Sequence, residues 1–98
     1  MNSRTELQIT QMISYAGSAR SHYIKAIDAA ADPEEFEKLI QNGDSCFDQA
    51  HRIHFNLLQE NPEGIAEGML LMIHAEDQMS AAETFRILAR KFRDIQQN

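Results

Sequence analysis

The sequence predicts an all-α protein, folded as an antiparallel up-down-up three-helix bundle. Apolar residues recur at spacings of three and four along almost the whole chain, which is the repeat of an amphipathic helix. Only two prolines occur, Pro33 and Pro62, and each lies in a segment typical of a helix boundary. No alternating run of β-branched residues suggests a strand. The 98 residues are expected to form a single domain, 1–98.

The first predicted helix covers roughly residues 3–31. Its apolar side chains form one stripe, made of Ile9, Met12, Ala16, Ala19, Tyr23, Ile27 and Ala30, with Ile13 alongside. Residues 16–19 read Ala-Gly-Ser-Ala, and a glycine inside a helix costs about 1 kcal/mol relative to alanine. Either the close approach of another helix or the need for space above a reactive side chain would explain this glycine.

The second and third predicted helices cover roughly residues 33–60 and 64–96. Asp32, Pro33 and Glu35 predict the N-cap, the first helical position and the capping-box position of the second helix. Its apolar seam consists of Phe36, Ile40, Phe47, Ala50 and Leu57, with Gly43 and His54 in the remaining positions. The seam of the third helix consists of Ile65, Met69, Met72, Ala75, Met79, Ala82 and Ala89, widened by Phe85 and Phe92. Short connections make consecutive helices antiparallel neighbours.

The third predicted helix carries a second stripe, nearly opposite the first. Its members are Leu70, His74, Asp77, Ala81, Thr84 and Leu88, at alternating gaps of four and three. One side of the helix can pack on the rest of its own chain, so the opposite side is either exposed or covered by another chain. The two leucines and the small alanine favour another chain, and a partly exposed monomer helix is the alternative.

Composition excludes several classes of protein. A net charge of −6 argues against a dedicated nucleic-acid binder, and the basic residues Arg86, Arg90, Lys91 and Arg93 suit a helix C-terminus. Cys46 is the only cysteine, so an internal disulfide is excluded, and we expect it to act as a small apolar residue. With neither an apolar N-terminal segment nor a membrane-length apolar run, the protein is expected to be cytoplasmic, without membrane insertion.

His74 is the strongest candidate for chemistry. Five apolar residues, 69–73, precede it, and this run predicts that more than one side of the helix is covered. A neutral imidazole is a good nucleophile, and Asp77, three residues further on, can orient it. Gln78, one turn after His74, is the nearest group able to orient a phosphate on the same helix. A hydrogen-bonded structural histidine is the alternative.

A second group consists of Asp48, His51 and His54 on the second helix. Adjacent pairs among them have a spacing that could bind a metal, but they fall short of a full site. Solvated or core-edge histidines are therefore the preferred interpretation.

Three segments resemble the lactose/cellobiose family of IIA components of the phosphoenolpyruvate-dependent sugar phosphotransferase system. Residues 73–79, Ile-His-Ala-Glu-Asp-Gln-Met, resemble that family's Val-His-Ala-Gln-Asp-His segment. Residues 16–21, Ala-Gly-Ser-Ala-Arg-Ser, look like its Ala-Gly-x-Ala-Arg-Ser stretch, and Ala50-His51 resembles a recurrent Ala-His in its second helix. The three matches are in register over nearly the whole chain.

The resemblance implies a homotrimer of three-helix bundles and a phosphotransferase component with a phosphohistidine intermediate at His74. His74 would take phosphate from the histidine phosphocarrier protein and pass it to a cysteine of a IIB component. This transfer would serve the uptake of a β-linked disaccharide of the lactose, cellobiose or chitobiose type, with the sugar selected by a membrane partner.

The resemblance also implies that three copies of Asp77 meet around a metal on the threefold axis. Converging carboxylates repel one another unless a cation or protons neutralise them, and Mg²⁺ suits all-oxygen ligation. Two residues depart from the family pattern: Glu76 replaces the usual Gln, and Gln78 replaces a frequent His. Glu76 points away from His74 on its own helix, but across an interface it could approach a neighbour's His74 and orient the phosphate. A carboxylate there would also repel the phosphate and raise the pKa of the histidine.

Two other functions are consistent with the residues. The chain could be a non-catalytic trimeric helical adaptor in which His74 is structural. It could also be a metal-binding helical bundle that uses His51, His54 and His74. A phosphate on His74 would support only the phosphotransfer function.

Overall fold

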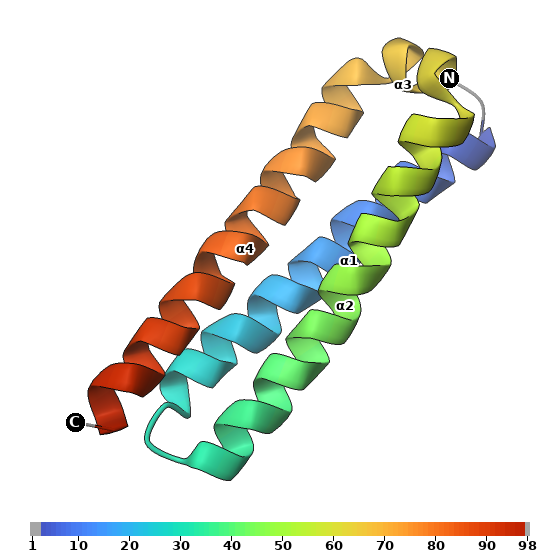
Figure 1. Cartoon of the computed structure of the whole chain (residues 1–98). Helices are drawn as coiled ribbons and strands as arrows, with labels where there is room; N and C mark the ends of the chain where they lie inside the picture. The colour runs from blue at the N-terminus through green and yellow to red at the C-terminus, as the bar shows by residue number, and fades with distance from the viewer. Residues whose placement is uncertain (1–2, 98) are drawn as a thin grey trace.

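The computed structural model describes residues 3–97 and confirms an all-α protein, with no strand in this range. Four helices follow one another along the chain: α1 (Ser3–Asp28), α2 (Pro33–Glu60), α3 (Pro62–Glu67) and α4 (Met69–Gln97). The molecule is a rod of 50 × 17 × 17 Å, with the start of α1 and the short α3 at the same end (Figure 1). Among the described residues, no helix combines the length and apolar character needed to cross a bilayer.

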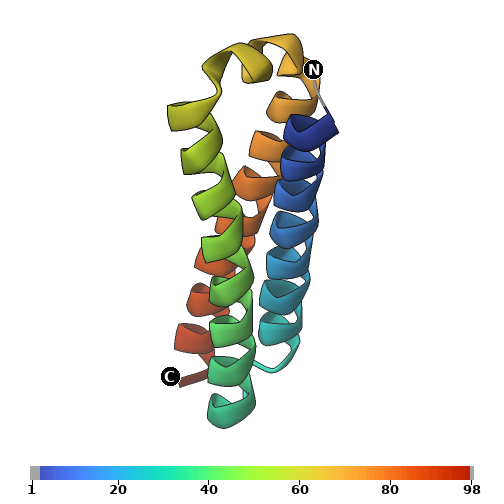
Figure 2. The same ribbon diagram turned by 90° about the vertical axis from the view of Figure 1, so that its right-hand side faces the viewer.

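Helix α1 lies between the two other long helices. Helices α2 and α4 each pack along α1 but contact each other at few positions. Helices α1 and α4 run in the same direction and α2 runs in the opposite one, as Figures 1 and 2 show. The two outer helices therefore meet mainly through long side chains, and these side chains decide which residues of α2 and α4 act together.

The predicted stripe of α1 forms the centre of the core. Its fully buried residues are Thr5, Ile9, Met12, Ala16, Ala19, Tyr23 and Ala26. The stripe is as predicted except near its two ends, where Thr5 and Ala26 are also buried and Ile27 packs against the core only in part. The helix ends at Asp28 instead of residue 31, because the following residues turn, with Asp32 N–H donating to Ala29 O at 2.9 Å.

Helix α2 agrees with the prediction in its bounds, cap and seam. The Asp32 side chain accepts a hydrogen bond from Glu35 N–H at 3.2 Å, which confirms the N-cap, and Pro33 begins the helix. The buried residues are those predicted, except that His54 is partly exposed: Phe36, Ile40, Gly43, Phe47, Ala50 and Leu57. Cys46 packs partly against this core.

The prediction of one continuous helix over residues 64–96 is wrong, because the chain breaks at Gly68. Asn61 caps α3 by accepting a hydrogen bond from Gly64 N–H at 3.0 Å. Gly68 N–H donates to Gly64 O and Ile65 O and closes this short helix, after which α4 starts in a new direction. Helix α3 thus carries the chain across the end of the rod and places α4 against α1 (Figure 1).

The buried face of α4 is narrower than predicted. Met72, Ala75, Met79, Ala82 and Ala89 are buried, and small residues here and on α1 let the two helices approach closely. Met69 and Phe92, which were expected to belong to the seam, are exposed. Within one chain, the apolar run 69–73 is covered on one side only, since Leu70 and Ile73 are exposed as well.

The basic residues of α4 bind neighbouring elements, which differs from the predicted role at the helix C-terminus. Arg86 Nε donates to Asp44 Oδ1 at 3.0 Å, and Arg90 Nη1 donates to Glu37 Oε1 at 2.6 Å, both on α2. Arg93 Nη1 donates to the carbonyl of Ala30 in the α1–α2 turn at 3.0 Å. The contacts of Arg86 and Arg90 hold α4 in register with α2, although the two helices lie close together at few positions.

Candidate functional site

His74 lies on the outer side of α4, away from α1, and its side chain is exposed. Within a single chain, this position contradicts the expectation that His74 is set into a covered surface of the helix. Within residues 3–97 the imidazole has no hydrogen-bond or ion-pair partner, so it is no structural histidine fixed inside its own chain. Its ring nitrogens are free to react or to bind across an interface.

Asp77 lies on the same outer side, in the middle of a row of exposed residues that we call the outer stripe. The outer stripe consists of Leu70, Ile73, Asp77, Ser80, Thr84 and Ile87. It shares Leu70, Asp77 and Thr84 with the predicted second stripe but is rotated away from Ala81, which is partly buried. Leu70 is the most exposed large apolar residue of the described chain, at 86%. Asp77 has no hydrogen-bond or ion-pair partner in residues 3–97, so its carboxylate is available to a ligand outside the chain.

His74 and Glu76 lie on opposite flanks of the outer stripe. Successive residues of an α-helix are about 100° apart around the helix axis. The side chains of His74 and Glu76 are therefore separated by about 200° around the axis of α4, but by only about 3 Å along it. Gln78 follows His74 by one turn on the same flank and is partly buried. Within one chain, Gln78 is thus placed beside His74, and Glu76 is not.

Glu76 faces α2, where it pairs with His54. His54 Nε2 lies 2.8 Å from Glu76 Oε2, with side-chain exposures of 22% and 46%. A carboxylate only accepts hydrogen bonds, so the imidazole nitrogen is the donor in this contact. The pair links α2 and α4, which otherwise contact each other at few positions. It lies within about 3 Å of the height of His74 along α4.

The other histidines do not gather with His74. The His51 ring packs against Phe47 with a centroid distance of 4.5 Å, and His51 and Asp48 line a shallow hollow that does not contain His74. Among residues 3–97 there is no group of three or more histidine, cysteine or acidic side chains that could hold a metal. The described chain therefore offers no site for the metal-binding bundle built from His51, His54 and His74.

A second polar cluster joins all three long helices further along the rod. The Tyr23 hydroxyl donates to Asp44 Oδ1 at 2.6 Å, and the same oxygen accepts from Arg86 Nε at 3.0 Å. Burial, and then the hydrogen bond to Asp44, raise the pKa of Tyr23 well above its usual value. The hydrogen bond to Asp44 also raises the pKa of Arg86. All three groups are paired, which favours a structural role.

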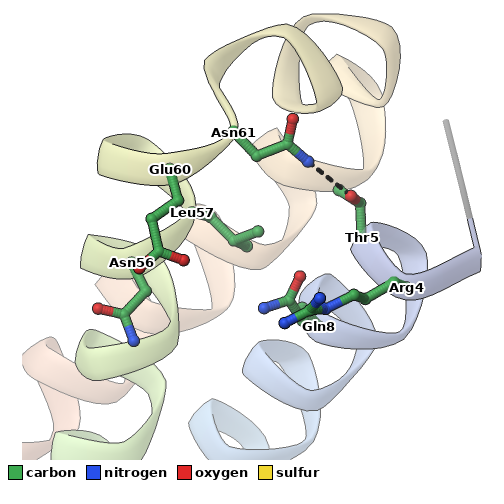
Figure 3. A pocket seen from close by; sticks show the side chains of 7 residues that line it. All are labelled: Arg4, Thr5, Gln8, Asn56, Leu57, Glu60 and Asn61. Carbon is green, nitrogen blue, oxygen red and sulfur yellow. Dashed lines mark hydrogen bonds between the residues drawn. The ribbon is translucent and has the colours of Figure 1, made fainter.

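The end of the rod near α3 contains a polar hollow of about 330 Å³ between α1 and α2. Figure 3 shows Arg4 and Gln8 reaching from α1 toward α2, and Asn61 Nδ2 donating to Thr5 Oγ1 at 2.7 Å. The remaining lining residues are Asn56, Leu57 and Glu60. None of the predicted site residues lines this hollow, and its Asn61–Thr5 contact ties α3 to the start of α1.

Sequence reasoning identified His74, Asp77 and Gln78 as neighbours on one helix, and the structure keeps them so. It missed the His54–Glu76 pair and the Tyr23–Asp44–Arg86 cluster, in which the hydrogen-bonded partners are 21 to 42 residues apart in the sequence. The identities of these residues carry no sign of the pairing, because it depends on the register between α2 and α4.

Comparisons with known proteins agree with the resemblance. The family described as "PTS system, Lactose/Cellobiose specific IIA subunit" matches residues 7–97. A lactose-specific EIIA component of Staphylococcus epidermidis is 35% identical over 82 residues, 78% of each chain. A lichenan-specific phosphotransferase enzyme IIA component of Bacillus subtilis is 34% identical over 98 residues, 97% of this chain and 89% of the relative.

A third relative, the oligo-beta-mannoside-specific EIIA component of Bacillus subtilis, is 32% identical over 95 residues, covering 93% of this chain and 86% of its own length. No solved structure gives a significant match. The family match covers almost the whole chain and includes the helix that carries His74. The chain therefore belongs to the lactose/cellobiose-specific IIA subunits of the sugar phosphotransferase system.

Proposed function

We propose that the chain is a phosphohistidine carrier that takes a phosphoryl group from the histidine phosphocarrier protein and passes it to a cysteine of a IIB component. The observation that carries this proposal is the exposed imidazole of His74 on the outer side of α4, which has no partner among residues 3–97. Phosphoryl transfer depends mainly on positioning and on charge stabilisation, so a sparse helical site is sufficient.

The transfer requires no net exchange of protons. The lone pair of one His74 ring nitrogen forms a bond to phosphorus while the donor's nitrogen–phosphorus bond breaks and its electron pair returns to the donor imidazole. The other His74 nitrogen keeps its proton throughout. In the second step the cysteine thiolate of the IIB component forms a sulfur–phosphorus bond, and the His74 nitrogen–phosphorus bond breaks.

We further propose that three chains assemble through their outer stripes. Leu70, Ile73 and Ile87 form a row of exposed apolar side chains that another chain would remove from water. Three α4 helices packed in parallel would place the outer stripe at the axis and the two flanks against neighbouring helices. The resemblance to the family supports three copies rather than two.

A parallel trimer would complete the site around His74. Because His74 and Glu76 lie on opposite flanks at nearly equal height, the His74 flank of one chain would face the Glu76 flank of its neighbour. Gln78 of the same chain would then lie beside the phosphoryl group, and the neighbour's Glu76, which is paired with His54 of its own α2, would lie across the interface from it.

Asp77 fits a divalent cation on the axis of such a trimer. Its carboxylate is in the outer stripe and has no partner among residues 3–97, and carboxylate oxygens suit a hard cation such as Mg²⁺. The ion would neutralise the mutual repulsion of three Asp77 side chains, and we assign it this structural role. The transfer steps on His74 do not need it.

The sugar served by the system is inferred to be a β-linked disaccharide. The names of the three relatives refer to lactose, lichenan and oligo-beta-mannosides, all of which contain β-linked sugars. The relevant class therefore includes lactose-, cellobiose- and chitobiose-type compounds, which a membrane partner of the system would select.

The test is incubation with phosphoenolpyruvate and the general phosphotransferase proteins, followed by intact mass. The wild type should gain one phosphoryl group per chain, and His74→Ala should gain none while its circular dichroism remains that of the wild type. His51→Ala is the matched control and should be phosphorylated normally. Full phosphorylation of His74→Ala would refute the assignment, and a trimer that takes no phosphate would favour the adaptor.

A further inference from the structure

The His54–Glu76 pair connects a residue of α2 to the proposed site on α4. A carboxylate at position 76 is unfavourable there, because it would repel the dianionic phosphoryl group on the neighbour's His74. In this chain, however, the carboxylate is held by His54 at 2.8 Å and directed toward α2.

We infer that His54 is a positioning residue for phosphotransfer: it holds Glu76 against α2, so that the carboxylate does not oppose the phosphoryl group on the His74 of the neighbouring chain. This inference rests on the proposed function and on the parallel trimer. The His54 ring N–H offsets part of the carboxylate charge and fixes its direction. Since His54 is three-quarters buried and Glu76 about half exposed, the contact orders a side chain that would otherwise be mobile.

The surroundings leave His54 as the residue that performs this role. In residues 3–97, no ion pair other than that with His54 engages Glu76. The arginines of α4 that could neutralise a carboxylate are engaged further along the rod, with Asp44 and Glu37. Loss of the His54 donor would therefore leave Glu76 free to turn toward the interface.

Four variants separate this role from simple packing, using the rate at which phosphorylated histidine phosphocarrier protein phosphorylates the trimer. His54→Phe keeps a ring but removes the donor, and it should slow transfer about tenfold, the order expected for one uncompensated charge a few ångströms from the phosphoryl group. His54→Gln keeps a donor and should stay close to the wild type. Glu76→Gln should not be slower than the wild type, because it removes the charge.

The decisive variant is the double substitution His54→Phe with Glu76→Gln. It keeps any packing defect of the phenylalanine but removes the carboxylate, so the rate should return to that of the wild type. A double variant as slow as His54→Phe alone would overturn the inference, as would a wild-type rate in His54→Phe.

Mixed trimers test whether the effect crosses between chains. Coexpressed His74→Ala and His54→Phe chains give trimers in which a reactive His74 faces an intact His54–Glu76 pair of the neighbour. The rate per His74 should then exceed that of His54→Phe homotrimers. An unchanged rate would overturn the action across the interface. A wild type that takes no phosphate on His74 would instead refute the proposed function itself.

Discussion

Tyr23 of α1 and Asp44 of α2 are joined by a 2.6 Å hydrogen bond, and the phenol ring fills the space above Gly43. Asp44 also accepts from Arg86 of α4, so one carboxylate connects all three long helices. The contact lies about three turns of α4 away from His74. It fixes the register of α2 and α4, and thereby determines which α2 residue faces Glu76.

We expect Tyr23 to make stability fall in alkaline solution. Burial and the hydrogen bond to Asp44 raise its pKa, so above about pH 10 the unfolded chain ionises Tyr23 while the folded chain keeps its proton. The native state then binds more protons, and the free energy of unfolding decreases as pH rises.

Urea unfolding of the wild type at pH 8 and above pH 10 measures this effect. Tyr23→Phe should be less stable at pH 8 by about 1 kcal/mol, because a partly buried hydrogen bond is lost, and its stability should decrease less in alkaline solution. If the free energy of unfolding decreased equally in the wild type and in Tyr23→Phe between pH 8 and the alkaline condition, the role of Tyr23 would be contradicted. Tyr15→Phe is the matched control, because Tyr15 is exposed.

Glycine-to-alanine substitutions at positions 43 and 17 should have opposite effects. A Cβ at Gly43 would lie 2.5 Å from Tyr23 Cε1, so Gly43→Ala must displace the ring and should cost about 1–3 kcal/mol. A Cβ at Gly17 would meet nothing within 4 Å, so Gly17→Ala should gain about 0.5–1 kcal/mol from helix propensity.

Thermal unfolding of both variants, with phosphotransfer assayed in parallel, distinguishes the explanations of Gly17. The expected close approach of another helix is wrong within one chain, since the space beside Gly17 is open. A stabilised Gly17→Ala trimer with slower phosphotransfer would indicate that a protein partner needs this space. A destabilised Gly17→Ala trimer would contradict the open space that the structure has beside Gly17.

Charge in the outer stripe should dissociate the proposed trimer. Leu70 is 86% exposed in a single chain, so Leu70→Lys should leave the helices intact while preventing three chains from burying this position. Light scattering at micromolar concentration should return a trimer for the wild type and the monomer mass of 11.2 kDa for Leu70→Lys. Leu7→Lys, at an exposed position of α1, should remain trimeric. A monomeric wild type would refute the assembly.

Asp77→Leu should strengthen the trimer and remove its response to chelators. Replacing grouped buried charges by apolar side chains of similar size is often neutral or stabilising by about 1–4 kcal/mol. The melting temperature of the wild type should fall on addition of a chelator, whereas that of Asp77→Leu should be higher and insensitive. Dissociation of the Asp77→Leu trimer would contradict a cation on the axis. A wild type whose melting temperature does not change on addition of a chelator would contradict it as well.

The sequence by itself determined the features that depend on residues a few positions apart in the same helix. The cap at Asp32, the buried stripe from Ile9 to Tyr23 and the seam of α2 all follow from spacings within one helix, and the structure has them. The position of His74 outside the core face of α4 follows from the same periodicity. The break at Gly68 was not predicted, because a single glycine in a helical pattern is compatible with both a continuous and an interrupted helix.

Only the tertiary structure decided which residues of different helices act together. Once α3 has turned the chain across the end of the rod, α1 lies in the middle, and α2 meets α4 only through long side chains. The pairing of His54 with Glu76 and of Asp44 with Arg86 depends on the axial register of α2 and α4. Helical periodicity fixes the direction of a side chain around its own axis but not its height relative to another helix, so no pattern within one segment contains this register.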